Sequence, residues 1–178
     1  MVTKEASYVH IVENLLQKDD SLRVLGVIRN PLATLASWAQ APKEFSPEWN
    51  LIDEWYDAPS KNQGRREEYY GYAKWKSAAT NFLRYCEKYP SQFNLVNYNL
   101  LNERTLEVVT DLFDFCELNI TQQTTDFICD SKSRHEIDPY SVYRSKANDD
   151  QWRNILPEHI VEFILDDLDG TELEQFLN

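Results

Sequence analysis

The segment that most restricts the fold is a short apolar run at residues 22–28, which is followed at once by Arg29, Asn30 and Pro31. An apolar run of this length between polar residues is typical of a strand buried in a parallel sheet. Asn30 can cap a helix, and Pro31 suits the first helical turn because its missing N–H would have no partner there. The sequence therefore predicts a strand, a tight turn and a helix over residues 31–39, which is half of a βαβ unit.

The remaining residues continue this alternation of strands and helices. Apolar residues at helical spacing predict four more helices, over residues 8–18, 70–88, 102 or 103 to 118, and from Pro157 onward. Residues 93–98 indicate a second strand, and residues 2–5 are a candidate third. Residues 121–150 are polar and lack periodicity, so no helix is predicted there. We expect an α/β fold, a parallel sheet flanked by helices, in a single domain over residues 1–178.

Charge and composition exclude several classes of protein. The formal net charge of −12 argues against broad contact with nucleic acid, which requires many Lys and Arg contacts to phosphate. No apolar run is long enough for a membrane span, and no signal peptide is evident, so we expect a cytoplasmic protein. The three cysteines and three histidines lack the spacing of a metal site, and we expect no metal. Any anionic ligand must be held by a few cations in a locally positive cleft.

The best candidate for such a cation is Arg29, at the carboxyl end of the first predicted strand, where ligands of open α/β sheets bind. Taken alone, an arginine here fits a structural ion pair equally well. Arg29 is followed by Pro31 and, eight residues later, by Ser37. This pattern resembles the 3′-phosphate-binding motif of sulfotransferases that use 3′-phosphoadenosine 5′-phosphosulfate (PAPS). The resemblance implies that Arg29 and Ser37 hold the 3′-phosphate of the nucleotide.

Three further segments resemble this family in the same chain order. Residues 95–101 resemble the segment whose tyrosine lies near the adenine; Tyr98 would take that role, or else simply pack at a strand end. Residues 143–154 resemble the loop that closes over the 3′-phosphate, which implies phosphate contacts for Arg144 and Lys146; the alternative is a solvated surface pair. Residues 3–8 resemble a segment that lines the reaction centre. Three residues in or near it are candidates for catalysis or acceptor binding: Lys4, Glu5 and His10.

The family also implies a fold related to P-loop kinases, with a loop around the 5′-phosphosulfate in its first strand–loop–helix unit. No Gly-x-x-x-x-Gly-Lys run occurs, and the chain has only four glycines. We therefore expect this unit to be lacking, whether the chain is a fragment, a truncated reading frame or a degenerate relative. The sheet edge left open would invite self-association or a missing N-terminal segment.

The function implied by the resemblance is transfer of a sulfuryl group from PAPS to a hydroxyl or amine of an acceptor. Residues 40–71 contain three prolines and many Trp and Tyr residues, and we interpret them as an insertion or lid on the acceptor side. Aromatic side chains stack on sugars and on small aromatic acceptors alike. Residues 42–45 and 69–72 resemble bacterial polysaccharide sulfotransferases more than phenol or steroid enzymes, which implies a carbohydrate acceptor. Two alternatives remain: a non-catalytic relative that binds nucleotide or glycan, and a protein related to nucleotide kinases.

Overall fold

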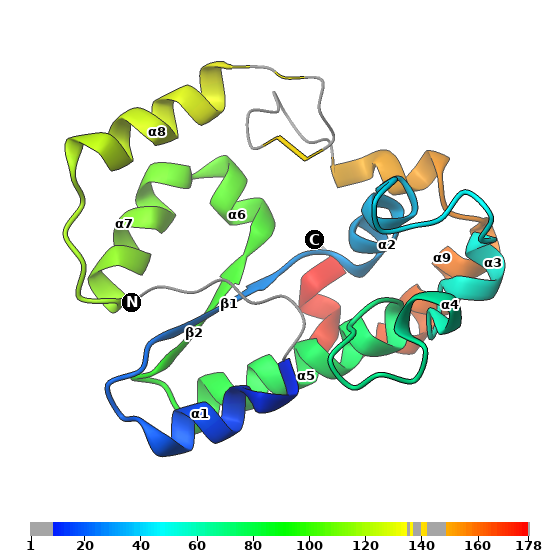
Figure 1. Ribbon diagram of the computed structural model, residues 1–178, viewed down its shortest axis with the longest axis horizontal. Helices are drawn as coiled ribbons and strands as arrows, with labels where there is room; N and C mark the ends of the chain where they lie inside the picture. The colour runs from blue at the N-terminus through cyan, green and yellow to red at the C-terminus, as the bar shows by residue number, and fades with distance from the viewer. Residues whose placement is uncertain (1–8, 135, 137–139, 142–148, 178) are drawn as a thin grey trace.

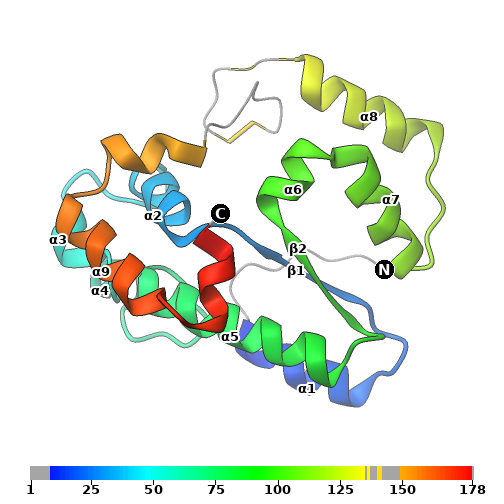
Figure 2. The same ribbon diagram turned by 180° about the vertical axis from the view of Figure 1, so that it is seen from behind.

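Two parallel strands lie between two groups of helices in the computed structural model, which describes residues 9–134, 136, 140–141 and 149–177 (Figures 1 and 2). Strand β1 (Val24–Ile28) pairs with β2 (Phe93–Asn97), with Val24 opposite Phe93 and Ile28 opposite Asn97. The short helices are η1 (Val9–Ile11), α3 (Leu51–Glu54), α4 (Pro59–Asn62), α6 (Tyr98–Glu103), η2 (Asp149–Asn154) and η3 (Glu172–Leu177). The longer ones are α1 (Val12–Lys18), α2 (Pro31–Ala39), α5 (Tyr72–Lys88), α7 (Thr105–Phe115), α8 (Gln122–Ser133) and α9 (Glu158–Leu168). The parallel sheet expected from the sequence is confirmed for the described residues.

The helices form two groups around the strands. Helices α1 and α5 lie on one side of the pair of strands, and α6, α7 and α8 lie on the other, in both views (Figures 1 and 2). Beyond the carboxyl end of β1, α2 packs with α5, α9 and η3 around the main core, whose fully buried residues include Leu32, Ile160, Ile164 and Leu168. A second core of Leu16, Tyr85 and Phe93 joins α1, α5 and β2. The carboxyl end of β1 therefore lies beside the main core, to which its last residue Ile28 belongs.

The turn between β1 and α2 forms as the sequence predicts. The Asn30 side chain accepts a hydrogen bond from the Leu32 N–H at 2.9 Å, and Pro31 occupies the first helical position. The Asn30 amide also donates to the Leu177 carbonyl at 2.6 Å, which ties η3 to the same turn. The start of α2 is thus fixed from both sides, and the residues next to it inherit a defined position.

Two expectations about the helices between residues 98 and 133 are wrong. The single helix expected from residue 102 or 103 to 118 is divided into α6 and α7 at Arg104, whose φ of −121° and ψ of 47° are not helical. Helix α6 starts earlier than expected because the Asn97 side chain accepts from the N–H groups of Asn99 and Leu100 and caps it directly after β2. Helix α8 was not expected; only Ile128 of its residues is buried, so its sequence carries almost no apolar periodicity.

An ion pair between α9 and α5 should make stability depend on pH. Asp167 Oδ2 accepts hydrogen bonds from Lys76 Nζ at 2.6 Å and Tyr72 Oη at 2.5 Å, and the bond from Lys76 is the main reason that the pKa of Asp167 is lowered. A carboxyl whose folded pKa is depressed stabilises the fold above its unfolded pKa, and this contribution is lost as pH falls through the folded value. We expect Asp167→Asn to reduce the loss of unfolding free energy between pH 7 and pH 3, measured by urea titration. The matched variant Asp166→Asn should keep the loss of the native chain; an equal effect of both variants would contradict this assignment.

Candidate functional site

Arg29, the residue directly after β1, is held by groups from three other segments, two through its side chain and one through its backbone. Its Nε and Nη2 donate to Asp149 Oδ1 of η2 at 2.8 and 2.6 Å. Its guanidinium lies over the Tyr98 ring of α6, 4.8 Å from the centroid. Its carbonyl accepts from the Trp75 indole of α5 at 2.9 Å. The guanidinium is therefore fixed in place, while the Arg29 side chain as a whole remains 23% exposed.

Asp149 of η2 pairs with the edge of the Arg29 guanidinium that carries Nε and Nη2. Its Oδ1 accepts both guanidinium bonds, while its Oδ2 is buried and has no hydrogen-bond partner in the described part of the chain. A buried carboxylate oxygen without a partner is unfavourable, so this carboxylate is poorly satisfied where it lies. Arg144 and Lys146 lie outside the described residues, and their expected phosphate contacts stay predictions. Asp149, the first residue of η2 and three residues after Lys146, contacts Arg29.

A cavity of about 390 Å³ opens between the end of β1, α2 and α5. Arg29 and the exposed Ser37 both line it, as do the aromatic rings of Trp38, Trp75 and Phe82. The structure thus brings together two residues that lie eight positions apart in the sequence, and Tyr98 joins them through its contact with Arg29. Arg29 and Ser37 therefore border the same cavity at the carboxyl end of β1.

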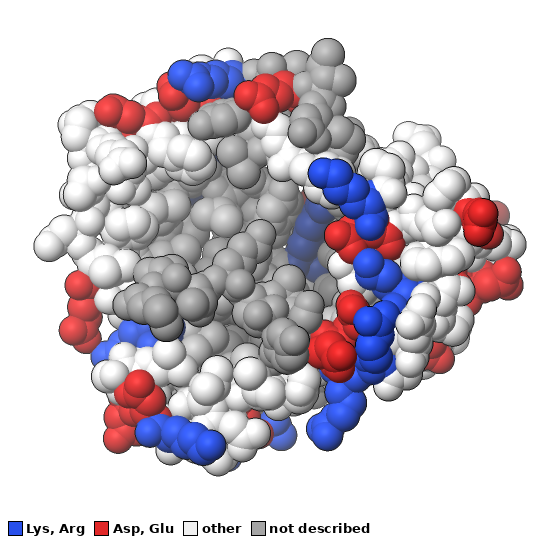
Figure 3. All heavy atoms as spheres, viewed as in Figure 1, with Lys and Arg blue, Asp and Glu red and all other residues white. Residues whose placement is uncertain are grey.

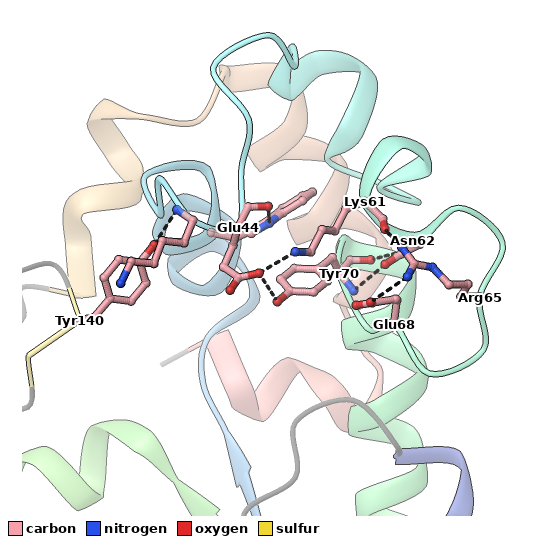
Figure 4. Close-up of polar contacts among 9 residues, drawn as sticks. Glu44, Lys61, Asn62, Arg65, Glu68, Tyr70 and Tyr140 are labelled. Atoms are coloured by element: carbon pink, nitrogen blue, oxygen red, sulfur yellow. Dashed lines mark hydrogen bonds and ion pairs between the residues drawn. The ribbon is translucent and has the colours of Figure 1, made fainter.

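The part of the cavity farther along α2 is bordered by residues from the 40–71 segment (Figure 4). Glu44 Oε2 accepts hydrogen bonds from Lys61 Nζ at 2.6 Å and from Tyr70 Oη at 2.9 Å. The bond from Lys61 lowers the pKa of Glu44, and burial, followed by the bond to Glu44, raises the pKa of Tyr70. At neutral pH Glu44 is therefore ionised and Tyr70 protonated, so the Tyr70 hydroxyl donates to the Glu44 carboxylate in this wall.

Three candidates from the sequence remain: Lys4, Glu5 and His10. Lys4 and Glu5 lie outside the described residues. His10 is half-buried in η1 and is not among the described residues that line the cavity. Within the described ranges, then, no side chain is assigned as a catalytic base. The helices of these ranges also include none long and apolar enough to cross a membrane.

Four residues of the site were missed by sequence reasoning: Glu44, Tyr70, Trp75 and Asp149. Asp149 is one of 30 acidic residues, and nothing local marks it as the partner of an arginine 120 positions away. Glu44 and Tyr70 lie in the segment interpreted as an acceptor-side wall, but its many aromatic residues gave no means of choosing among them. Trp75 was missed because it donates to a backbone carbonyl, and a contact of that kind has no sequence signal.

Comparison with known proteins gives one finding. The family model described as "Sulfotransferase domain" matches residues 5–173, which is nearly the whole chain. Curated proteins and solved structures gave no match.

Proposed function

The chain belongs to the sulfotransferase domain family, and on that basis we propose that it binds PAPS and presents its sulfuryl group to a hydroxyl or amine of a carbohydrate acceptor. Sulfuryl transfer is the general activity that the family supports; the donor and the acceptor are our proposal. One observation carries it: Arg29 and Ser37 line one cavity at the carboxyl end of β1.

The proposed role of Arg29 and Ser37 is to bind the 3′-phosphate of the donor. A guanidinium offers several N–H donors in a planar fork, which suits bidentate contact with phosphate, and a serine hydroxyl adds a further donor. Tyr98 beneath the guanidinium limits the directions in which this fork can turn. Fixing the 3′-phosphate would fix the position of the sulfate at the other end of the nucleotide, and such positioning lowers the barrier to transfer.

The proposed acceptor site is the part of the cavity bordered by Glu44 and Tyr70. Sulfuryl transfer, like phosphoryl transfer, requires in-line geometry, with donor groups placed where charge develops. The Glu44 carboxylate, held ionised by Lys61, is suited to accept a hydrogen bond from an acceptor hydroxyl and so orient it. The rings of Trp75 and Tyr70 offer apolar faces against which a sugar can pack. These residues orient the acceptor; they do not remove its proton.

The contact between Arg29 and Asp149 predicts a gain of affinity on mutation. If the nucleotide phosphate uses the Arg29 fork, it must displace the Asp149 carboxylate. Asp149→Asn should therefore bind adenosine 3′,5′-bisphosphate about 1.5- to 5-fold more tightly, the range for a partly exposed ion pair. Calorimetry on this variant and on the neighbouring Asp150→Asn is the measurement. Weaker binding by Asp149→Asn would show instead that Asp149 positions Arg29 for the ligand.

Nuclear magnetic resonance tests the binding site directly. Adding adenosine 3′,5′-bisphosphate to the ¹⁵N-labelled chain should shift the Nε–H signal of Arg29 and the indole N–H signal of Trp75, which donates to the Arg29 carbonyl. The indole signal of Trp55, which packs on Tyr56, Tyr72 and Phe163 away from the cavity lining, should stay in place. Saturation with nucleotide that leaves the Arg29 and Trp75 signals unmoved would refute the proposed site.

A further inference from the structure

A band of basic residues borders the cavity in a chain that is otherwise strongly acidic. Between residues 61 and 76, five basic residues outnumber two glutamates, although the whole chain carries a net charge of −12. The five are Lys61, Arg65, Arg66, Lys74 and Lys76. Figure 3 shows Lys and Arg atoms in a band over the part of this face where the 40–71 segment lies, with Asp and Glu atoms between them. A local excess of positive charge attracts anionic ligands to that part of the surface.

Four of these five cations, together with Lys43, form a surface that we call the basic band, whereas Lys76 pairs with Asp167 of α9. The band consists of Lys43, Lys61, Arg65, Arg66 and Lys74. Lys43 precedes Glu44, and Glu44 accepts from Lys61 (Figure 4). Arg65 Nη2 donates to the Lys61 carbonyl, and Arg65 pairs with Glu68. The Tyr69 ring lies 5.0 Å from Lys74 Nζ, and Arg66 is three residues before Tyr69 in the chain.

Three cations of the band have no carboxylate partner among the described residues: Lys43, Arg66 and Lys74. Lys43 and Lys74 lie instead over tyrosine rings, with Lys43 Nζ 4.6 Å from the centroid of Tyr140. A cation over an aromatic face keeps its charge available to a third group. The band thus presents free positive charge beside tyrosine rings.

The band reaches the cavity through two shared residues. Glu44 and Tyr70, which bind Lys61, also line the cavity that contains Arg29 and Ser37. A polymer lying along the band would therefore pass the cavity mouth and could place one of its groups there. Separate surface charge elsewhere on the molecule would have no such connection with the site.

We propose that the basic band binds an anionic polysaccharide, one whose sugars carry carboxylate or sulfate groups. The cations would contact its anionic groups, the tyrosine rings would pack against sugar C–H faces, and the carboxylates of Glu44 and Glu68 would accept hydrogen bonds from sugar hydroxyls. Nucleic acid fits less well, because a phosphodiester backbone offers few hydrogen-bond donors to the carboxylates that lie between the cations of the band. That the polymer is the sulfuryl acceptor rests on the proposed function; that the band binds it does not.

Binding of polygalacturonate, an acidic polysaccharide, tests the proposal without nucleotide. The band variant Lys43→Gln/Arg66→Gln/Lys74→Gln is compared with the control Lys18→Gln/Lys88→Gln/Arg104→Gln, which removes the same charges from surfaces on α1, α5 and the α6–α7 junction. Glutamine keeps most of each side-chain stem, and circular dichroism checks that both variants fold. We expect the dissociation constant to rise about tenfold or more in the band variant and less than about twofold in the control, with a clear decrease of affinity as salt increases.

Two further polymers decide what is recognised. Neutral dextran should bind far more weakly than polygalacturonate, and oligodeoxythymidylate of matched charge should also be weaker. Equal weakening in the band and control variants would overturn the location, and equal affinity for oligodeoxythymidylate would overturn the preference for sugar. Failure of the nucleotide to bind, with polygalacturonate binding intact, would instead overturn the proposed function and leave the surface assigned.

Discussion

Replacing Arg29 with Gln is expected to weaken binding of adenosine 3′,5′-bisphosphate by about 30-fold or more, because loss of a charge-assisted contact costs about 2 kcal/mol or more. Affinity for adenosine 5′-monophosphate should change little, since that ligand lacks the 3′-phosphate that Arg29 is proposed to bind. Isothermal titration calorimetry with both nucleotides gives the two numbers. An equal loss for both ligands would place Arg29 away from the 3′-phosphate.

Two controls separate lost binding from damaged folding. Arg23→Gln removes an arginine just before β1, where Arg23 pairs with Glu117, and it should leave both affinities unchanged. The double variant Arg29→Gln/Asp149→Asn avoids leaving the Asp149 carboxylate without its partner. If the double variant recovered native nucleotide affinity, the effect of Arg29→Gln would be due to Asp149 alone.

Replacing Gly71 with Ala should destabilise the protein by about 3 kcal/mol or more, because two independent penalties combine at this position. Its φ of 84° and ψ of 163° belong to a region that residues with a Cβ rarely adopt. An added Cβ would also lie 2.6 Å from the Tyr56 carbonyl oxygen, a backbone atom that cannot rotate away. Because Gly71 precedes α5 and follows Tyr70, the lining of the cavity should be disturbed as well. Urea unfolding measures the change.

Gly64 provides the matched control for this prediction. Its φ of 71° is also positive, but an added Cβ would meet nothing within 4 Å. Gly64→Ala should therefore show only the backbone penalty, about 1 kcal/mol. Similar free energies of unfolding for the two variants would mean that close packing at Gly71 is not what makes that residue necessary.

The elements predicted well are those whose signals are local. The strand at β1 and the helix α2 follow from an apolar run, an Asn cap and a proline at the first helical position, all within a few residues. The long helix α5 and the helix α9 have strong apolar faces and were also predicted. The short helices α3 and α4 lie within residues 40–71, and the role of that segment as a lid stays a prediction. Helix α8 was missed because it buries almost nothing.

The site was predictable only where a residue stands at the end of an element. Arg29 could be placed at the ligand-binding edge because it directly follows a strand. Ser37 could be placed near that edge because it lies in the helix that begins directly after Arg29 and Asn30. Asp149 and Glu44 reach the site by tertiary contacts across long separations, and an acidic chain offers many carboxylates of equal standing. The roles of Lys4, Glu5, Arg144 and Lys146 remain predictions of the family resemblance.

The most direct test of the central claim is a comparison of two nucleotides on the native chain. In calorimetric titrations, adenosine 3′,5′-bisphosphate should bind at least about tenfold more tightly than adenosine 5′-monophosphate. The reason is that Arg29 and Ser37, which line the cavity, are proposed to contact a phosphate that only the first ligand carries. Equal affinity for the two nucleotides, or no binding of either, would contradict the central claim.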